Sequence, residues 1–290
     1  MRKYEYYAPT SFEQLFELAA SGADVRFLAG GTDLVPGISM EKDQIPYEKK
    51  PPMRILYLGG LSGLDKVKNE GDTVTIGALC TLASLLEDGT VKEKLPALRE
   101  AITVMAGMSV RNTATIGGNI MNASPAADSV PVLLALEAEF TLRSAAGERK
   151  IAASEFFTGP GKTAAKPGEA LISISVKPGR GGTAFRKLGR RKAETLSVVN
   201  AAAYVEVENG AFSKVRIAVG SAAPTVVRCH EVEQALMGKK TDEKRVQEAA
   251  ALVDKSISPI DDIRSSAWYR NKVAPTMVAR AVLAAISRNK

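Results

Sequence analysis

A short glycine-rich segment divides the chain into two parts with different patterns: residues 177–182, KPGRGG. Proline and closely spaced glycines interrupt helices and strands alike, so this composition is typical of a connection between folded units. A chain of 290 residues is long enough for two domains that share an interface. We therefore expect one domain at 1–177, with subdomains at about 1–58 and 59–177, and a second at 183–290.

Strands and helices alternate in the first part. Thr10 and Glu13 have the spacing of a capping box, and the apolar residues that follow them recur at helical intervals. Ser124 and Pro125 are typical of the N-cap and first position of a helix, which we expect to run to Leu136 with Asp128 in its first turn. The pattern further predicts strands at 25–29, 54–58, 73–77, 139–143 and 171–176, a helix at 92–106, and loops at 41–52 and 109–125.

The second part begins with a hairpin signal. Apolar segments at 201–207 and 212–219 flank Asn209 and Gly210, a pair that accepts the positive φ of a tight turn. Helical patterns follow at about 229–238, 242–254 and 266–287. This order predicts an antiparallel hairpin followed by three helices.

Two segments with paired glycines are candidates for a cofactor site. Ala29-Gly30-Gly31-Thr32-Asp33-Leu34 follows an apolar strand, and Thr115-Ile116-Gly117-Gly118-Asn119 lies in the long polar loop. Paired glycines let the backbone approach a ligand and turn N–H groups toward an anion such as a diphosphate. Each segment alone is also compatible with an ordinary tight turn. Two such segments in one domain strengthen the cofactor interpretation and leave the tight turn as an equal alternative.

Two other glycine-rich segments only resemble nucleotide-binding motifs. Residues 179–184 nearly fit G-x-G-x-x-[GA], but they lead into a strand pattern and not into the helix that a dinucleotide fold needs. Residues 159–163 resemble the end of a P-loop, but Phe156 replaces its first glycine and Pro160 lacks an N–H. We reject both.

Sulfur and imidazole ligands are scarce. The chain has two cysteines, Cys80 and Cys229, and one histidine, His230. They are too few for an iron–sulfur cluster or a structural zinc site. We expect the cysteines to be buried or half-buried and His230 to begin a surface helix without a catalytic partner. Redox chemistry would therefore need a bound organic cofactor.

The net charge of +7 does not indicate a nucleic-acid binder. The basic cluster at 186–192 has no aromatic residues between its cations, which leaves a basic surface or a phosphate or protein contact. No apolar stretch approaches the roughly 18 residues that a bilayer requires, and the N-terminus lacks the apolar core of a secretory signal. We expect no membrane association and a cytoplasmic protein.

The two glycine segments carry a family resemblance. AGGTDL at 29–34 and TIGGNIMNASPAADSVP at 115–131 resemble the FAD-binding medium subunit of the molybdenum hydroxylases, the family of xanthine, carbon monoxide and nicotinate dehydrogenases. The similarity extends to 157–163, 185–200 and 221–225, and covers essentially the whole chain. It implies an α+β protein: an FAD-binding domain of the vanillyl-alcohol-oxidase type with two α/β subdomains, and a C-terminal domain with a three-stranded antiparallel sheet and helices.

The resemblance also implies an FAD site, with FAD extended between the domains. Asp128 would accept hydrogen bonds from the adenosine end, the backbone of Leu171 and Ile172 would approach the isoalloxazine ring, and Lys187, or Arg186 in its place, would lie at the ring edge as a cation. Met105 and Ala106 would pack near the cofactor. The diphosphate and ribityl chain would be held by Leu28, Ala29, Gly30, Gly31, Thr32, Asp33, Leu34, Thr115, Gly117, Gly118, Asn119 and Asn122. Neither glycine segment has a nearby His or Cys for covalent attachment, which predicts noncovalent FAD.

The resemblance implies an electron-transfer subunit without a catalytic acid or base of its own. Molybdopterin would lie on a large partner subunit and two [2Fe–2S] clusters on a small one, and the flavin would pass electrons to NAD+ or another acceptor. The stretch GNIMNASP at 118–125 favours a xanthine-type complex, with nicotinate, aldehydes and carbon monoxide as alternatives. Two other hypotheses are a self-contained flavin oxidoreductase and a nucleotide-binding module without redox turnover.

Overall fold

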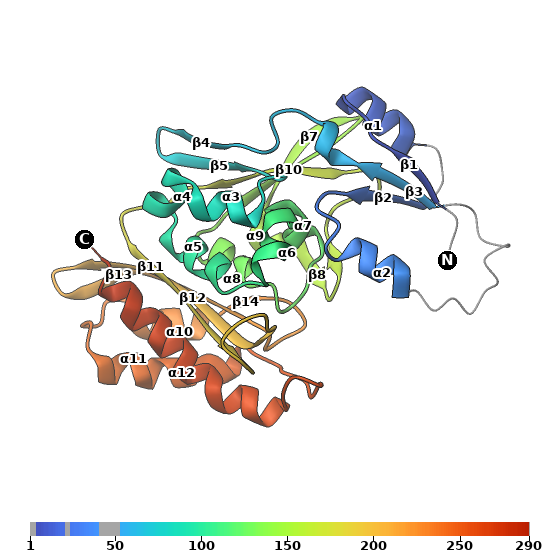
Figure 1. Cartoon of the computed structure of the whole chain (residues 1–290). Helices are drawn as coiled ribbons and strands as arrows, with labels where there is room; N and C mark the ends of the chain where they lie inside the picture. The colour runs from blue at the N-terminus through green and yellow to red at the C-terminus, as the bar shows by residue number, and fades with distance from the viewer. Residues whose placement is uncertain (1–3, 21–23, 41–52, 290) are drawn as a thin grey trace.

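The computed structural model describes residues 4–20, 24–40 and 53–289 (Figure 1). The loop expected at 41–52 lies outside these residues. Within them, strands form sheets of three, five and four strands and a small two-stranded hairpin. Two of the larger sheets lie before the connection at 177–182 and one lies after it.

The first sheet is parallel. Its order is β1 (Tyr4–Tyr7), β3 (Met53–Tyr57), β2 (Asp24–Leu28). Helix α1 (Phe12–Ala19) begins one residue later than its capping box predicts, because the hydroxyl of Ser11 accepts from the Gln14 N–H at 3.3 Å. Helix α2 (Leu34–Met40) was not predicted, since its proline and glycine disfavour a helix of this length.

The second sheet is antiparallel throughout, in the order β4, β5, β10, β6, β7. Its edge strands β4 and β7 are polar and largely exposed, so they lack the apolar pattern that predicts the three inner strands. The bounds are β4 (Val67–Glu70), β5 (Thr73–Gly77), β10 (Ala170–Val176), β6 (Glu139–Ser144) and β7 (Gly147–Ala152). Leading into or out of this sheet are η2 (Leu58–Gly60), α9 (Ala153–Phe156) and the hairpin β8 (Phe157–Gly159) and β9 (Lys162–Thr163).

Several short helices pack with this sheet in one hydrophobic core. The single helix predicted at 92–106 is wrong: Pro96 begins a new helix, and Ala106 has a left-handed φ of 46°. The long loop predicted at 109–125 is wrong as well, because it folds into α6 and α7. The bounds are α3 (Leu82–Glu87), α4 (Gly89–Lys94), α5 (Pro96–Thr103), α6 (Met108–Thr113) and α7 (Ile116–Met121).

Helix α8 (Ser129–Ala135) begins later than Ser124 and Pro125 predict. The Ser124 hydroxyl accepts from the Ala126 N–H at 3.3 Å in a turn, and the helix starts only after Asp128. Asp128 is the N-cap residue, yet its side chain makes no capping hydrogen bond. Its carboxylate points elsewhere, as described below.

The C-terminal sheet has the predicted antiparallel hairpin. Asn209 and Gly210 adopt φ values of 52° and 73° between its two longest strands. A two-residue strand adds one member to the three that were expected. The order is β11 (Gly182–Gly189), β12 (Ser197–Glu208), β13 (Ala211–Gly220) and β14 (Val227–Arg228), followed by α10 (His230–Leu236), α11 (Glu243–Ala250), η3 (Ala251–Lys255) and α12 (Ala267–Ile286).

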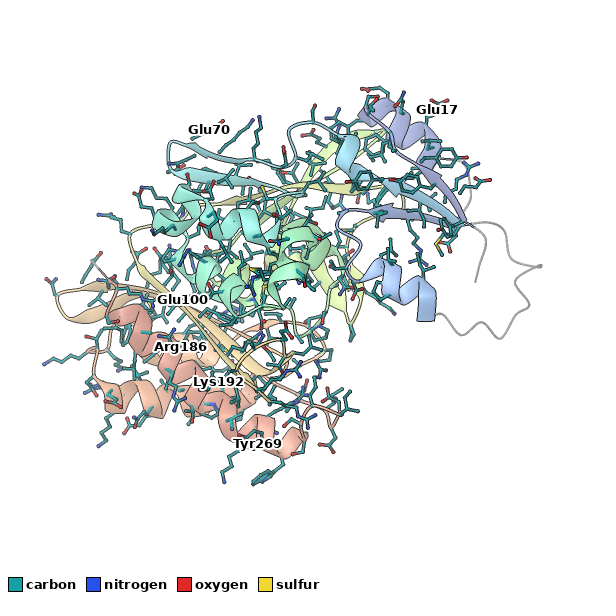
Figure 2. All side chains as sticks on the ribbon, viewed as in Figure 1. Glu17, Glu70, Glu100, Arg186, Lys192 and Tyr269 are labelled. Atoms are coloured by element: carbon teal, nitrogen blue, oxygen red, sulfur yellow. The ribbon has the colours of Figure 1, made fainter. Side chains whose placement is uncertain are left out.

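This sheet joins the two parts of the chain. Helix α12 covers one face, and the other face packs against α5 and α8 (Figure 1). At the junction Glu100 of α5 accepts from the Phe185 N–H at 2.9 Å and pairs with Arg186 at 3.5 Å. Glu100 and Arg186 are labelled in Figure 2. Arg288, after α12, pairs with the same carboxylate. Glu100 of the N-terminal part therefore contacts residues near both ends of the C-terminal part.

Candidate functional site

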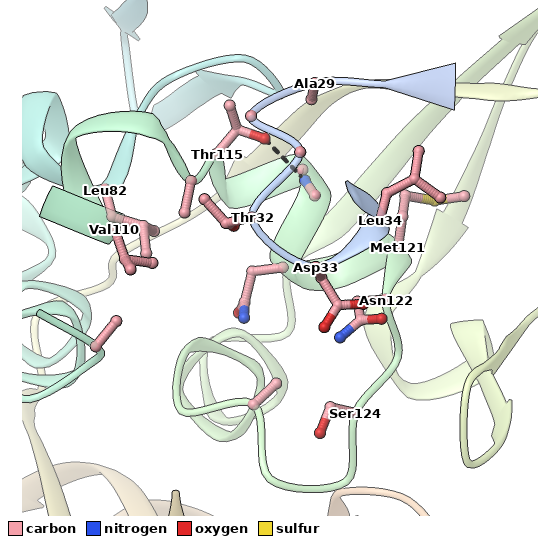
Figure 3. Close-up of a pocket in the computed structure, with 18 of the residues that line it drawn as sticks. Ala29, Thr32, Asp33, Leu34, Leu82, Val110, Thr115, Met121, Asn122 and Ser124 are labelled. Carbon is pink, nitrogen blue, oxygen red and sulfur yellow. Dashed lines mark hydrogen bonds between the residues drawn. The ribbon is translucent and has the colours of Figure 1, made fainter. Parts of the chain in front are cut away.

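A cavity of about 990 Å³ lies where the three large sheets meet (Figure 3). Its wall combines the end of β2 and the segment after it, helices α6 and α7, the residues before α8, and the β11–β12 region. The volume is at the upper end of the range for small-molecule and cofactor pockets. All of the expected FAD-site residues line it except Leu28 and Ile172.

The segment 29–34 crosses one side of this cavity. Figure 3 shows it passing over α7, with Asp33 near Asn122. Gly31 has a φ of +69°, which a side chain would oppose, and a Cβ on Gly30 would lie 1.9 Å from the Thr113 carbonyl oxygen. Within the described ranges, no acceptor from the chain itself pairs with the backbone N–H groups of Gly31 and Thr32. These donors are available to a ligand.

The second glycine segment differs from its expectation. It forms the first turn of α7, where the Gly117 N–H donates to Ala78 O at 2.9 Å and the Gly118 N–H donates to the Thr115 hydroxyl at 3.0 Å. A Cβ on Gly117 would lie 2.6 Å from Ala78 O. Gly117 therefore allows α7 to pack on the chain after β5, and its N–H is not free to bind an anion.

Amide side chains supply donors on this second side. Asn119 Oδ1 accepts from the Ser129 hydroxyl at 2.6 Å, which orients its Nδ2 group as the remaining donor. Asn122 is exposed on the cavity wall beside Asp33 (Figure 3). The expected ring of glycine N–H groups is thus replaced by backbone donors on one side and amide groups on the other.

Asp128 and Lys187 form an ion pair in the cavity wall. Lys187 Nζ lies 2.6 Å from Asp128 Oδ2, and the side chains are only 8% and 5% exposed. One pair of bonded side chains cannot contact opposite ends of an extended dinucleotide. The expectation that Asp128 serves the adenosine end while Lys187 serves the isoalloxazine edge is therefore wrong for at least one of them. Arg186, the alternative cation, pairs with Glu100 and does not line the cavity.

Two further segments of the wall are shaped by backbone bonds. Arg111 donates to the carbonyl oxygens of both Met105 and Ala106 at 2.7 Å, which holds Ala106 in its left-handed conformation. Leu171 lines the cavity at an irregularity of β10, whereas the Ile172 carbonyl accepts from the Ala78 N–H at 3.0 Å. The Ile172 carbonyl is thus engaged within the protein, and Leu171 is the one of these two β10 residues that lines the cavity.

Several wall residues were not predicted. Residues 194–196, in the connection between β11 and β12, close the cavity, with Glu194 at a positive φ of 49°. Ser124, Ala126 and Ala127 contribute from the turn before α8. Gly161, between β8 and β9, also lines the cavity, but its N–H donates to Ala123 O at 3.0 Å, after α7, so no P-loop forms. No local sequence signal marks the 194–196 connection, because tertiary packing alone brings it to the site.

The cavity wall contains no cysteine and no histidine among the described residues. Burial raises the pKa of the Cys80 thiol to about 11 and that of the Cys229 thiol to about 12. His230 begins α10 and is 66% exposed, and its Nδ1 lies 3.2 Å from Glu233, a partner that the sequence did not reveal. That carboxylate already pairs with Arg228 at 2.7 Å, so the contact is structural. The described residues also include no group of three or more His, Cys, Asp or Glu side chains suited to a metal ion.

None of the helices in the described part of the chain combines the length and apolarity needed to cross a bilayer.

Comparison with known proteins agrees with this architecture. Residues 2–177 match the family model described as the FAD binding domain in molybdopterin dehydrogenase, and residues 183–285 match the CO dehydrogenase flavoprotein C-terminal domain. The two matches meet at the connection 177–182.

Relatives of similar length match from end to end. The glyceraldehyde dehydrogenase medium chain of Sulfolobus acidocaldarius is 32% identical over 280 residues, which cover 96% of this chain and 97% of the relative. The xanthine dehydrogenase FAD-binding subunit of Escherichia coli O157:H7 is 30% identical over 285 residues, covering 97% and 96%. The solved carbon monoxide dehydrogenase of Hydrogenophaga pseudoflava contains a chain that superposes with a TM-score of 0.93 at 32% identity, covering 99% of each.

Proposed function

Because the chain belongs to the family of FAD-binding medium subunits of molybdenum hydroxylases, we propose that it carries FAD in the cavity described above and relays electrons from a partner's [2Fe–2S] clusters to NAD+. One observation supports this site most directly: free backbone donors at 31–32 face amide donors of α7 across a single cavity of about 990 Å³. In members of this family, molybdopterin and the iron–sulfur clusters are carried by other subunits.

The residues of this chain bind and orient the cofactor. The N–H groups of Gly31 and Thr32 donate to the diphosphate, since neutral donors pointing at one place stabilise an anion without a counter-charge. The Thr32 hydroxyl and the amides of Asn119 and Asn122 add donors. Met105, Ala106 and Leu171 form the apolar surfaces on which a flat ring packs.

Bound FAD would supply the redox chemistry, accepting electrons one at a time and releasing them as a hydride. The chain's own residues would exclude water from the ring and leave one edge open to partners. FAD would be held noncovalently, because the described cavity wall lacks the His and Cys side chains that attach flavins.

We further propose that the molybdenum partner acts on a purine-like heterocycle, as the 118–125 stretch suggested. This chain is 32% identical to the glyceraldehyde dehydrogenase subunit and 30% identical to the xanthine dehydrogenase subunit, a difference of only two percentage points. Aldehydes, nicotinate and carbon monoxide are therefore the alternatives, and a cytoplasmic location stays a prediction. Co-purification of the large subunit and assay of the complex on each substrate class would decide.

The visible spectrum of the purified chain tests the proposal. A flavin spectrum that NADH bleaches, together with NADH-dependent dye reduction, is the expected result. Hydroxylation of purines or nicotinate should require the added partner subunits. Hydroxylation by this chain alone would favour a self-contained flavin enzyme, and a colourless chain that takes up no FAD would refute the proposal. A flavin that NADH does not bleach would replace NAD+ by another acceptor.

A further inference from the structure

Asp128 is surrounded by donors that all belong to the other domain. It precedes α8 on the FAD-binding side and is 4% exposed. Its Oδ1 accepts from the Ser197 hydroxyl at 2.5 Å and from Asn200 Nδ2 at 2.6 Å, and its Oδ2 accepts from Lys187 Nζ at 2.6 Å. Lys187 lies on β11, and Ser197 and Asn200 lie on β12.

Lys187 is held as firmly as its partner. Besides the bond to Asp128, its ammonium donates to the Val104 carbonyl at 3.1 Å, in the chain segment that leads to Met105 and Ala106. An ammonium has three N–H donors, so one remains. Since Lys187 lines the cavity, that donor is available to a ligand.

Few other cations border the cavity. Among the described wall residues, the basic side chain besides Lys187 is Arg26, which is 51% exposed and pairs with Asp24 at 3.1 Å. Lys187 is thus the buried cation of the wall, and its charge is masked by an equally buried anion. Charges in such a position interact strongly because water does not screen them.

We propose that Asp128 is a positioning residue that aims the Lys187 ammonium at the flavin ring and masks its charge, so that the reduction potential of the flavin reflects a neutral pair and not a free cation. This inference rests on the proposed FAD site and assigns the pair to the isoalloxazine end. Asp128 then makes no contact with adenosine. Its carboxylate is an internal counter-ion of the lysine that faces the cofactor.

The physical consequence concerns the reduced flavin, which carries a negative charge when its N1 position is deprotonated. An unmasked ammonium nearby stabilises that anion and raises the midpoint potential. An unmasked carboxylate does the opposite. Removing both charges returns the site to neutrality.

A charge cycle on the full chain, or on the complex with which it purifies, tests this inference. Asp128→Asn keeps an acceptor for Lys187 while removing the charge, and we expect a more positive flavin potential. Lys187→Met should give a more negative potential. The double variant should return close to the wild-type value. Asp88→Asn is the matched control, because Asp88 is also an N-cap aspartate, accepting from the Val91 N–H at 2.9 Å in α4, outside the cavity wall.

Unchanged potentials in the two single variants, Asp128→Asn and Lys187→Met, would overturn the inference and assign the pair to the other end of the cofactor. If Lys187→Met leaves the Asp128 carboxylate unpaired and this variant does not fold, the potential of the Asp128→Asn variant alone decides. FAD content and the melting curve of each variant separate a change of potential from a loss of fold. If the wild-type chain takes up no FAD, the proposed function itself fails, which is a different result from FAD binding with equal potentials.

Discussion

At the site, the backbone of Gly30 packs so closely against the end of α6 that no Cβ fits at position 30. This contact yields a quantitative prediction. A Cβ at position 30 would lie 1.9 Å from Thr113 O and 2.7 Å from Thr113 C, whereas real Cβ contacts essentially never fall below 3.0 Å. Both atoms belong to the backbone, so no side chain can rotate away. Gly30→Ala must therefore move the 29–34 segment away from α6 by about 1 Å.

This displacement has two expected costs. Overpacking of a well-packed contact destabilises proteins by about 1–3 kcal/mol, which for a protein of this size corresponds to a fall in Tm of roughly 2–10 °C. The same shift pulls the N–H groups of Gly31 and Thr32 from their ligand positions. Loss of one hydrogen bond to a charged group costs about 1.5–3 kcal/mol, or roughly a 10- to 100-fold weaker Kd for FAD.

FAD titration by fluorescence and a melting curve of the FAD-free protein measure the two costs separately. Gly89→Ala is the control, since a Cβ there meets nothing within 4 Å at the exposed start of α4. Gly179, although outside the site, is unsuitable as a control because it has a φ of +72° and its Cβ would lie 2.1 Å from the Tyr204 hydroxyl. A Gly30→Ala protein with wild-type Tm and wild-type affinity for FAD would refute the reasoning.

Further predictions concern titration, attachment and reactivity. Burial raises the pKa of Glu100, but hydrogen bonds from Arg288 and the Phe185 N–H outweigh the effect of burial and hold this pKa below the ordinary 4.5. The Glu100 carboxylate therefore stabilises the folded state fully above pH 4.5. This stabilisation is lost as the pH falls through the pKa of Glu100 in the folded state. Glu100→Gln should melt earlier than wild type at pH 7, with the difference shrinking below about pH 4 in melts across a pH series; a constant difference would contradict the linkage. Acid precipitation should release all of the flavin into the supernatant, and colour that stays with the pellet would mean a covalent bond. Cys80 and Cys229, with pKa values raised to about 11 and 12, should resist alkylation at pH 8 until the protein unfolds, and rapid labelling of the native chain would show that they are accessible.

Local patterns predicted the parts of the fold in which burial is regular. The inner strands of the second sheet and the β12–β13 hairpin were found because their apolar residues recur at the period of a strand and Asn209-Gly210 marks the turn. The polar edge strands β4 and β7 escaped because nothing buries their side chains. Helices α6 and α7 escaped because six-residue helices carry too few apolar positions to show a period.

The candidate site shows the same division. Its glycine segments were visible as motifs, and the structure brings them to one cavity. What the glycines do was not visible: Gly117 makes room for Ala78 O, a backbone atom that is 39 positions earlier in the chain. The pairing of Asp128 with Lys187 depends on the docking of two domains, which no spacing within either one encodes.

The cavity wall, which all three large sheets contribute to, also affects how readily the chain is degraded in a cell. A ligand that touches both Val25 and Leu196 must leave before any of the surrounding units can open, so free FAD at a hundred times its Kd adds about 2.7 kcal/mol against unfolding. Proteases act on the opened form, and their access therefore declines as flavin supply rises. Copies without FAD would therefore be degraded faster than copies with FAD bound.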